Sequence, residues 1–211
     1  MKTLRPQKTS FEVDNSSMPN ELRTSRTALR RLEPTHAEDY AELFRSNYDR
    51  LVPHFAPEFR ALDEVNGMRN FISKKLREWD QRTTYLYGIF NTENQLIGKV
   101  EVYGLAWDIP KAYVSYFISD TYEGKGLISE VVNRLLSYCY EQMGFLKIEL
   151  RTSTDNTASH NIARRFGFRH EGTLTQNYRR YSGEVVDLMV WGLGREEWKK
   201  NQQSRRNEQE P

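Results

Sequence analysis

A short glycine-containing segment at residues 122–129, Tyr-Glu-Gly-Lys-Gly-Leu-Ile-Ser, carries the residue types that can bind phosphate. The alternating, β-branched and aromatic residues 112–119 before it predict a strand, and the apolar spacing of residues 128–140 after it predicts a helix. The glycines therefore lie in a turn that begins a helix, where backbone N–H groups and the helix dipole can attract an anion. Such a turn can cradle phosphate oxygens, although its spacing fits neither a Walker loop nor a dinucleotide-binding loop. A purely structural turn is the alternative.

A second polar segment, Asp-Asn-Thr-Ala-Ser-His-Asn at residues 155–161, precedes and begins another predicted helix. Asn156 stands just before the helix and can act as its N-cap, which is an ordinary role for asparagine. Ser159 lies three residues later, in the first turn on the same side, and can serve as a capping residue as well. Residues 166–172, Phe-Gly-Phe-Arg-His-Glu-Gly, follow the helix.

The remaining pattern predicts an α/β sandwich around one central sheet, which would position both segments. A strand is expected over 27–32, followed by a helix that begins near Pro34, with Thr35 as N-cap and Glu38 completing a capping box. A second helix is expected over 62–79, with its apolar residues on one side. The further expected strands span 85–90, 95–104, 112–119, 147–152, 169–180 and 184–192, and the further expected helices span 128–143 and 159–166.

The two ends of the chain carry little hydrophobic periodicity. Residues 1–20 are expected to form a flexible leader, and residues 21–198 to form the domain. Residues 199–211 contain no apolar side chain and are expected to be a disordered polar tail.

The composition excludes several classes of protein. Hydrophobic residues make up 37% of the 211 residues, which is enough for a core, yet no apolar run approaches the ~20 residues that cross a bilayer. A net charge of +2, with basic and acidic residues intermixed, gives no sign of a nucleic-acid partner. The single cysteine, Cys139, rules out a disulfide framework, and no His/Cys/Asp grouping has the spacing of a metal site. We expect a cytoplasmic monomer or homodimer without membrane partners.

Together the two polar segments resemble the motifs of the GNAT superfamily of N-acetyltransferases. Residues 122–129 resemble its pyrophosphate loop, written R/Q-x-x-G-x-G/A, and residues 155–172 resemble its N-x-x-S/A helix followed by G-F-x-x-E-G. Details over 22–30, over 46–51 and at Gly98 resemble the branch that acetylates the N-termini of ribosomal proteins, including its ribosomal-protein-serine members.

This resemblance covers roughly residues 22–198 and has two departures. Glu123 stands where arginine or glutamine is usual, and Ile128 stands where glycine or alanine is usual. A carboxylate beside a pyrophosphate repels it unless the side chain points away.

The resemblance implies acetyl-CoA as the acetyl donor and the GNAT fold, a mixed, mostly antiparallel sheet in which two parallel strands splay apart at the cofactor site. The splayed strands would be residues 114–118 and 148–152, with the pantetheine arm between them. The residues implied in cofactor binding are Tyr116, Phe117, Ile118, Glu123, Gly124, Lys125, Gly126, Leu127, Ile128, Ser129, Asn156, Ser159 and Arg164.

Acetyl transfer to an amine needs a neutral amine, a stabilised oxyanion and a proton for the departing thiolate. The resemblance implies that Ser159 gives this proton, because Ala163 stands where many other members carry a tyrosine. The base is open: Glu101 can act through water if its strand turns it towards the cleft, although strand parity favours a solvent-facing side chain. Tyr178 is implied in catalysis or substrate binding. An N-terminal amine with a pKa near ~7.7–8 is already largely neutral at pH 7.5 and needs no strong base.

The region over 47–55 is implied to cover the acceptor pocket. Asn47, Tyr48, Leu51 and Phe55 are expected to bind the acceptor there, and His54 is expected to be a surface or capping histidine. The expected acceptor is a protein N-terminus. The acidic residues between 33 and 64 favour a small amine instead, such as a polyamine or an aminoglycoside. The resemblance also implies a glutamate near residues 177–178, where this chain has Asn177 and Tyr178. This missing glutamate and Glu123 favour an inactive acyl-CoA-binding regulatory module.

Overall fold

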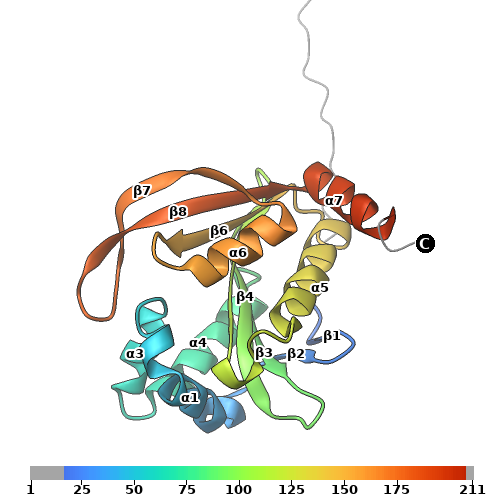
Figure 1. Ribbon diagram of the computed structural model, residues 1–211. Helices are drawn as coiled ribbons and strands as arrows, with labels where there is room; N and C mark the ends of the chain where they lie inside the picture. The colour runs from blue at the N-terminus through green and yellow to red at the C-terminus, as the bar shows by residue number, and fades with distance from the viewer. Residues whose placement is uncertain (1–16, 208–211) are drawn as a thin grey trace, which may run out of the picture.

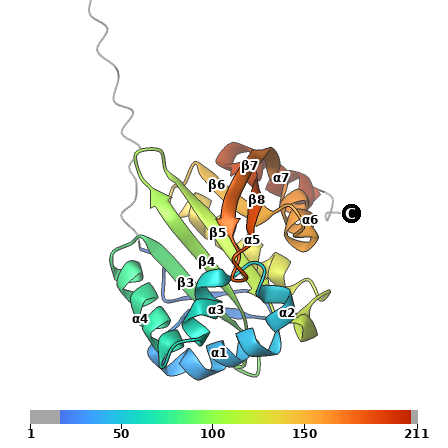
Figure 2. The ribbon, with the colours of Figure 1, turned by 90° about the vertical axis from the view of Figure 1, so that its left-hand side faces the viewer.

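The computed structural model describes residues 17–207 and contains an eight-stranded sheet with the strand order β1-β2-β3-β4-β5-β6-β8-β7 (Figures 1 and 2). Within this part of the chain the strands pair antiparallel except for β5 and β6, which are parallel. The expected mixed, mostly antiparallel sheet is therefore confirmed. The strands are β1 Glu21–Arg23, β2 Ala28–Arg31, β3 Thr84–Phe90, β4 Leu96–Ala106, β5 Lys111–Ile118, β6 Lys147–Ser153, β7 Arg169–Arg179 and β8 Val185–Gly194.

Helices cover both faces of the sheet (Figure 2). The α-helices are α1 Ala37–Ser46, α2 Tyr48–Leu51, α3 Ala56–Leu62, α4 Gly67–Asp80, α5 Leu127–Glu141, α6 Thr157–Phe166 and α7 Arg195–Asn207, and short 3-10 helices span Pro34–His36 and Asp120–Tyr122. Successive residues of a strand point to opposite faces. On β3, Tyr87 therefore packs in the cluster that contains α5, whereas Leu86 packs in the cluster of α1, α3 and α4. Burial on both faces explains why β3 is buried along its whole length.

The parallel pair β5 and β6 separates partway along its length. Its paired residues end at Tyr113 with Glu149, although β5 continues to Ile118 and β6 continues to Ser153. Backbone groups in the last part of each strand therefore lack their partner from the other strand. This is the splaying that the family resemblance implied.

The expected helix over 62–79 is wrong at its start. The structure instead has α3 and α4, separated at Asn66, whose left-handed backbone (φ +57°) interrupts the helix. Gly67 then begins α4 close to the preceding helix, because a Cβ atom there would lie 2.0 Å from the Ala61 carbonyl oxygen. A side chain at residue 67 cannot fit without a shift of the backbone.

The predicted capping box near Pro34 is also wrong. Residues Pro34–His36 form a 3-10 helix that begins at Glu33, and the Glu33 backbone N–H donates to Nδ1 of His36 at 2.9 Å. The reciprocal capping pair is therefore Glu33 and His36, two residues before the expected pair of Thr35 and Glu38.

Most of the expected polar tail is helical. Residues 199–207 continue α7, in which Trp198 is buried against the core. Asn201 Nδ2 donates to the Phe166 carbonyl oxygen at 3.3 Å, and Gln202 Nε2 donates to Asn133 Oδ1 at 2.8 Å. Polar contacts with α5 and α6 therefore hold a segment that has no apolar residue of its own. Of the expected flexible leader, residues 1–16 lie outside the described residues, whereas Met18 is buried in the core.

Truncation after Lys200 is expected to lower the free energy of unfolding by roughly 1.5–4.5 kcal/mol, because it removes the hydrogen bonds of Asn201, Gln202 and Arg205, worth about 0.5–1.5 kcal/mol each. Urea unfolding measures this loss. Truncation after Arg205 keeps these hydrogen bonds and should leave the stability nearly unchanged. Equal stability of the two truncated chains would contradict a structural role for these residues.

No helix within residues 17–207 combines the length and the apolar character needed to cross a membrane.

Candidate functional site

A cavity of about 710 Å³ lies where β5 and β6 separate. Its walls come from β4, β5 and β6, from the start of α6, and from the segment over 50–58. The hairpin of β7 and β8 arches over this segment, as Figure 1 shows. The cavity therefore connects the glycine loop with the region expected to receive the acceptor.

The glycine loop at residues 123–129 is open towards solvent. Gly124 and Gly126 have left-handed backbones (φ +71° and +77°), and a Cβ atom added to Gly124 would have no heavy atom within 4 Å. The N–H groups of Ser129 and Glu130 donate to the Gly126 carbonyl oxygen, so α5 begins at this glycine. The N–H groups before them have no acceptor within the helix. This open cradle of N–H groups fits a pyrophosphate.

Three side chains steady the loop. Arg26 donates to the Lys125 carbonyl oxygen at 2.9 Å and pairs with Glu130, and Arg165 donates to Ser129 Oγ at 2.9 Å. Arg164 was expected to contact the cofactor, but the structure brings its neighbour Arg165 to the loop region. The Arg164 guanidinium lies 5.5 Å from the centre of the Trp191 ring.

Glu123 is ion-paired. Its Oε1 lies 2.6 Å from Arg50, which comes from α2 and also donates to the Ile118 carbonyl oxygen at 3.0 Å and to Asn47 Oδ1 at 3.2 Å. Arg50 and Glu123 both line the cavity. The unusual carboxylate of the loop is therefore balanced by a guanidinium that the sequence motif does not contain.

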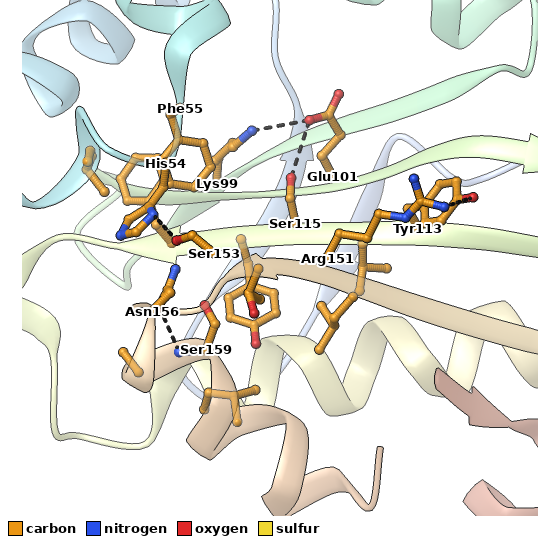
Figure 3. A pocket seen from close by; sticks show the side chains of 18 of the residues that line it. His54, Phe55, Lys99, Glu101, Tyr113, Ser115, Arg151, Ser153, Asn156 and Ser159 are labelled. Carbon is orange, nitrogen blue, oxygen red and sulfur yellow. Dashed lines mark hydrogen bonds and ion pairs between the residues drawn. The ribbon is translucent and has the colours of Figure 1, made fainter. Parts of the chain in front are cut away.

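The first turn of α6 brings Asn156 and Ser159 to the cavity. Asn156 Oδ1 accepts a hydrogen bond from the Ser159 backbone N–H at 3.0 Å, so Asn156 is the N-cap of α6. Its side-chain nitrogen points towards His54 and Ser153 (Figure 3). The Ser159 side chain lines the cavity and is half-buried.

The Tyr116 side chain adds a polar group that the sequence analysis did not anticipate. Its phenol oxygen is buried and lacks a well-formed hydrogen bond within residues 17–207. Burial raises the pKa of Tyr116, and the neighbouring Ser159 hydroxyl partly offsets this effect. Buried hydroxyl groups normally have a partner, so this phenol can serve a ligand atom that enters the cavity.

At the other end of the cavity, His54 faces the end of β6. Its Nδ1 lies 3.2 Å from Ser153 Oγ (Figure 3), and burial lowers the pKa of its imidazole. His54 is therefore neutral at pH 7 and can accept a proton. Because α2 and α3 turn this loop towards the splayed strands, His54 lies half-buried in the cavity wall.

Leu51, Phe55 and Tyr178, which were expected in the acceptor region, also line the cavity. The Tyr178 phenol oxygen accepts a hydrogen bond from the Ala56 backbone N–H at 3.0 Å, and burial raises the pKa of this phenol. Tyr178 therefore attaches the hairpin of β7 and β8 to the start of α3.

The structure places Asn47 and Tyr48 outside the cavity lining. The buried Asn47 amide donates to the Leu43 carbonyl oxygen at 2.9 Å and accepts from the Asp120 N–H at 3.0 Å. Tyr48 is 48% exposed, with its ring centre 5.2 Å from that of Phe59. Asn47 thus joins α1 to the segment before the glycine loop, and both expectations of acceptor contact are corrected.

A buried ionic cluster forms one wall of the cavity. Lys99 Nζ lies 3.2 Å from Glu101 Oε2 (Figure 3) and 2.7 Å from Glu58 Oε1. Lys75 Nζ lies 2.9 Å from Glu101 Oε1. Strand parity favoured a solvent-facing Glu101, but α3 and α4 cover this face of β4. Burial alone would raise the pKa of Glu101, yet the ammonium groups of Lys99 and Lys75 outweigh it and lower that pKa below its ordinary value.

The depressed pKa of Glu101 predicts a specific loss of stability in acid. The ion pairs contribute stability above the ordinary pKa of 4.5, and this contribution disappears as the pH falls through the lower folded-state pKa. We expect Glu101→Gln to lower the free energy of unfolding by roughly 2 kcal/mol at pH 7. This is less than the ~3–5 kcal/mol lost when a buried ion has no partner at all, because Lys99 remains paired with Glu58. Below pH 4.5 the wild type and the variant should converge.

Urea unfolding from pH 3 to pH 7 measures this convergence. Glu93→Gln, at an exposed residue of the turn between β3 and β4, should keep the pH dependence of the wild type. A constant difference between the wild type and Glu101→Gln across that range would contradict the assigned ion pairs.

Comparisons with known proteins agree on an acetyltransferase family. The family model described as "Acetyltransferase (GNAT) domain" matches residues 26–169. YdaF of Bacillus subtilis (strain 168), named as a candidate ribosomal N-acetyltransferase, is 27% identical over 175 residues, covering 81% of this chain and 92% of YdaF. Spermidine N(1)-acetyltransferase of Vibrio cholerae is 23% identical over 124 residues, covering 59% of this chain and 68% of that enzyme.

Among solved structures, RimL, a ribosomal L7/L12 α-N-protein acetyltransferase in complex with coenzyme A, superposes with a TM-score of 0.74. It is 19% identical in sequence, and the match covers 81% of this chain and 95% of the RimL chain. This likeness supports the fold.

Proposed function

The chain belongs to the GNAT acetyltransferase family, whose members use acetyl-CoA, and on that premise we propose that it acetylates the α-amine of a protein N-terminus. Acetyl-CoA supplies an activated acetyl thioester. The residues of this chain then have to bind its phosphates and hold its sulfur end beside the acceptor. They also have to take a proton from the amine and give a proton to the departing thiolate.

Residues 123–129 bind the pyrophosphate through backbone N–H groups at the start of α5. The unpaired edges of β5 and β6 hold the pantetheine arm, because their backbone groups beyond Tyr113 and Glu149 do not pair with each other. Two features support this placement. A bound ligand would fill the open space beside Gly124, and it would give the buried phenol of Tyr116 a hydrogen-bond partner.

Ser159 gives its hydroxyl proton to the departing thiolate and regains a proton from solvent before the next turnover. The Asn156 cap supports this role, because it fixes the first turn of α6 and so holds the Ser159 side chain at the cavity. The Tyr116 phenol beside Ser159 can donate a second hydrogen bond to the same sulfur end.

At the acceptor end, we propose that His54 rather than Glu101 receives the proton of the amine. The Glu101 carboxylate pairs with two ammonium groups, and this pairing makes it a weak base. His54 is neutral at pH 7 and lines the same cavity. Its lowered pKa suits an α-amine, which is partly neutral already at this pH.

The observation that favours an α-amine over a polyamine is the charge balance of the cavity. Its acidic residues within the described chain each have a cationic partner: Glu58 with Lys99, Glu101 with Lys75, Glu123 with Arg50, and Asp155 with Arg180. Of the acidic residues between 33 and 64, Glu58 alone lines the cavity. A polycation would find no unpaired carboxylate there. The names of YdaF and RimL also support a ribosomal-protein N-terminus as the acceptor.

A panel of matched acceptors tests this proposal. Peptides that copy bacterial ribosomal-protein N-termini are supplied with a free α-amine, with a blocked α-amine and an internal lysine, and beside spermidine. Thiol release and mass spectrometry report the product. We expect acetylation of the free α-amine alone, whereas acetylation of spermidine or of lysine in the blocked peptide would overturn the proposal.

A further inference from the structure

We propose that Arg50 is the cation that binds the pyrophosphate of acetyl-CoA, in place of the arginine or glutamine that usually stands at residue 123. The inference rests on the acetyl-CoA chemistry of the family and does not depend on which amine is acetylated. It assigns a cofactor contact to α2, a helix of the acceptor side.

The geometry around Arg50 supports a ligand contact. Its guanidinium reaches Glu123 Oε1, the Ile118 carbonyl oxygen and Asn47 Oδ1 at 2.6, 3.0 and 3.2 Å. These contacts use at most three of its five N–H groups, and the remaining ones can bind phosphate oxygens. Ile118 ends β5 beside the gap, so Arg50 lies where the pantetheine channel meets the glycine loop.

The other cations near the loop are less suitable. Arg26 pairs with Glu130, and Lys125 Nζ donates to the Thr121 carbonyl oxygen at 2.8 Å. Neither these two nor Arg165 lines the cavity, whereas Arg50 does. Arg50 is therefore the loop-side cation that faces the ligand space within residues 17–207.

The charge of the loop explains why a second residue is needed. An arginine at residue 123 would attract the pyrophosphate, whereas the Glu123 carboxylate repels it. Arg50 cancels this repulsion and holds a guanidinium at the same place, because an arginine can contact a carboxylate and a phosphate at the same time. Glu123 then acts as a positioning residue that holds Arg50.

Calorimetry with three ligands tests the assignment. Coenzyme A carries the pyrophosphate and the 3′-phosphate, dephospho-coenzyme A carries the pyrophosphate alone, and pantetheine carries neither. We expect Arg50→Gln to lower the affinity for coenzyme A and for dephospho-coenzyme A by about tenfold each, which is the value of one charge-assisted contact. The affinity for pantetheine should stay unchanged. The double variant Arg50→Gln/Glu123→Arg restores the motif and should recover most of the affinity.

Three results would overturn the proposal. If Arg50→Gln weakens the binding of all three ligands equally, or of none, the ion pair between Arg50 and Glu123 is purely structural. Weakening of coenzyme A alone would place Arg50 at the 3′-phosphate. Failure of the double variant to recover affinity, with a melting temperature equal to that of wild type, would show that a cation at this place is not what binds the pyrophosphate. None of these readouts involves the acceptor amine, so they are independent of the proposed acetylation of N-termini.

Discussion

Ser159→Ala is expected to lower kcat by about 100-fold, because a positioned proton donor contributes about 10²–10⁴-fold to such reactions. The affinity for coenzyme A should change little, since the Asn156 cap bonds to the backbone N–H of residue 159, which alanine retains. Steady-state kinetics at saturating acetyl-CoA, together with calorimetry, separate the two effects.

Thr157→Ala is the matched control for Ser159→Ala. It removes a hydroxyl from the same first turn of α6, and Thr157 also lines the cavity. We expect this control to retain most of the wild-type kcat. Similar losses in both variants, or a Ser159→Ala loss that appears only in the affinity for coenzyme A, would remove Ser159 from the role of proton donor.

Gly126→Val is expected to weaken coenzyme A binding by at least about 100-fold, through the loss of several phosphate contacts worth ~1.5–3 kcal/mol each. The valine Cβ would lie 3.5 Å from the Arg26 guanidinium, which holds the loop in place, and the branched side chain would also oppose the left-handed backbone at φ +77°. The thermal shift caused by millimolar acetyl-CoA should disappear together with the calorimetric signal.

Gly144→Val separates backbone strain from loss of the cradle. Gly144 has a similar backbone, φ +72°, with open space around its Cβ position, but it lies between α5 and β6, outside the glycine loop. Both variants should lose about 1–3 kcal/mol of stability to strain, whereas only Gly126→Val should lose the cofactor. Equal affinities for coenzyme A in the two variants would contradict the proposal that the glycine loop binds the pyrophosphate.

Much of the scaffold followed from periodicity, because β3, α5 and β6 bury the faces that their apolar patterns define. The splaying of β5 and β6 came from the family resemblance, since no local pattern shows where two distant strands stop pairing. The helical continuation of α7 was missed because Asn201 and Gln202 are held by other helices and not by apolar residues.

The site was less predictable than the scaffold for the same reason. Glu101 was expected to face solvent, and its burial depends on Lys75 and Lys99, which the fold brings together from α4 and β4. Arg50 meets Glu123 only because Asn47 holds the end of α1 against the segment before the glycine loop. Contacts between distant segments decide these charges, and a linear motif does not contain them.

A crystal structure of the protein with coenzyme A tests the central claim most directly. The account predicts that the pyrophosphate contacts the N–H groups of residues 124–128, and that the sulfur lies within hydrogen-bond distance of Ser159 Oγ. A pyrophosphate bound elsewhere, or a sulfur on the far side of β6 from Ser159, would contradict it.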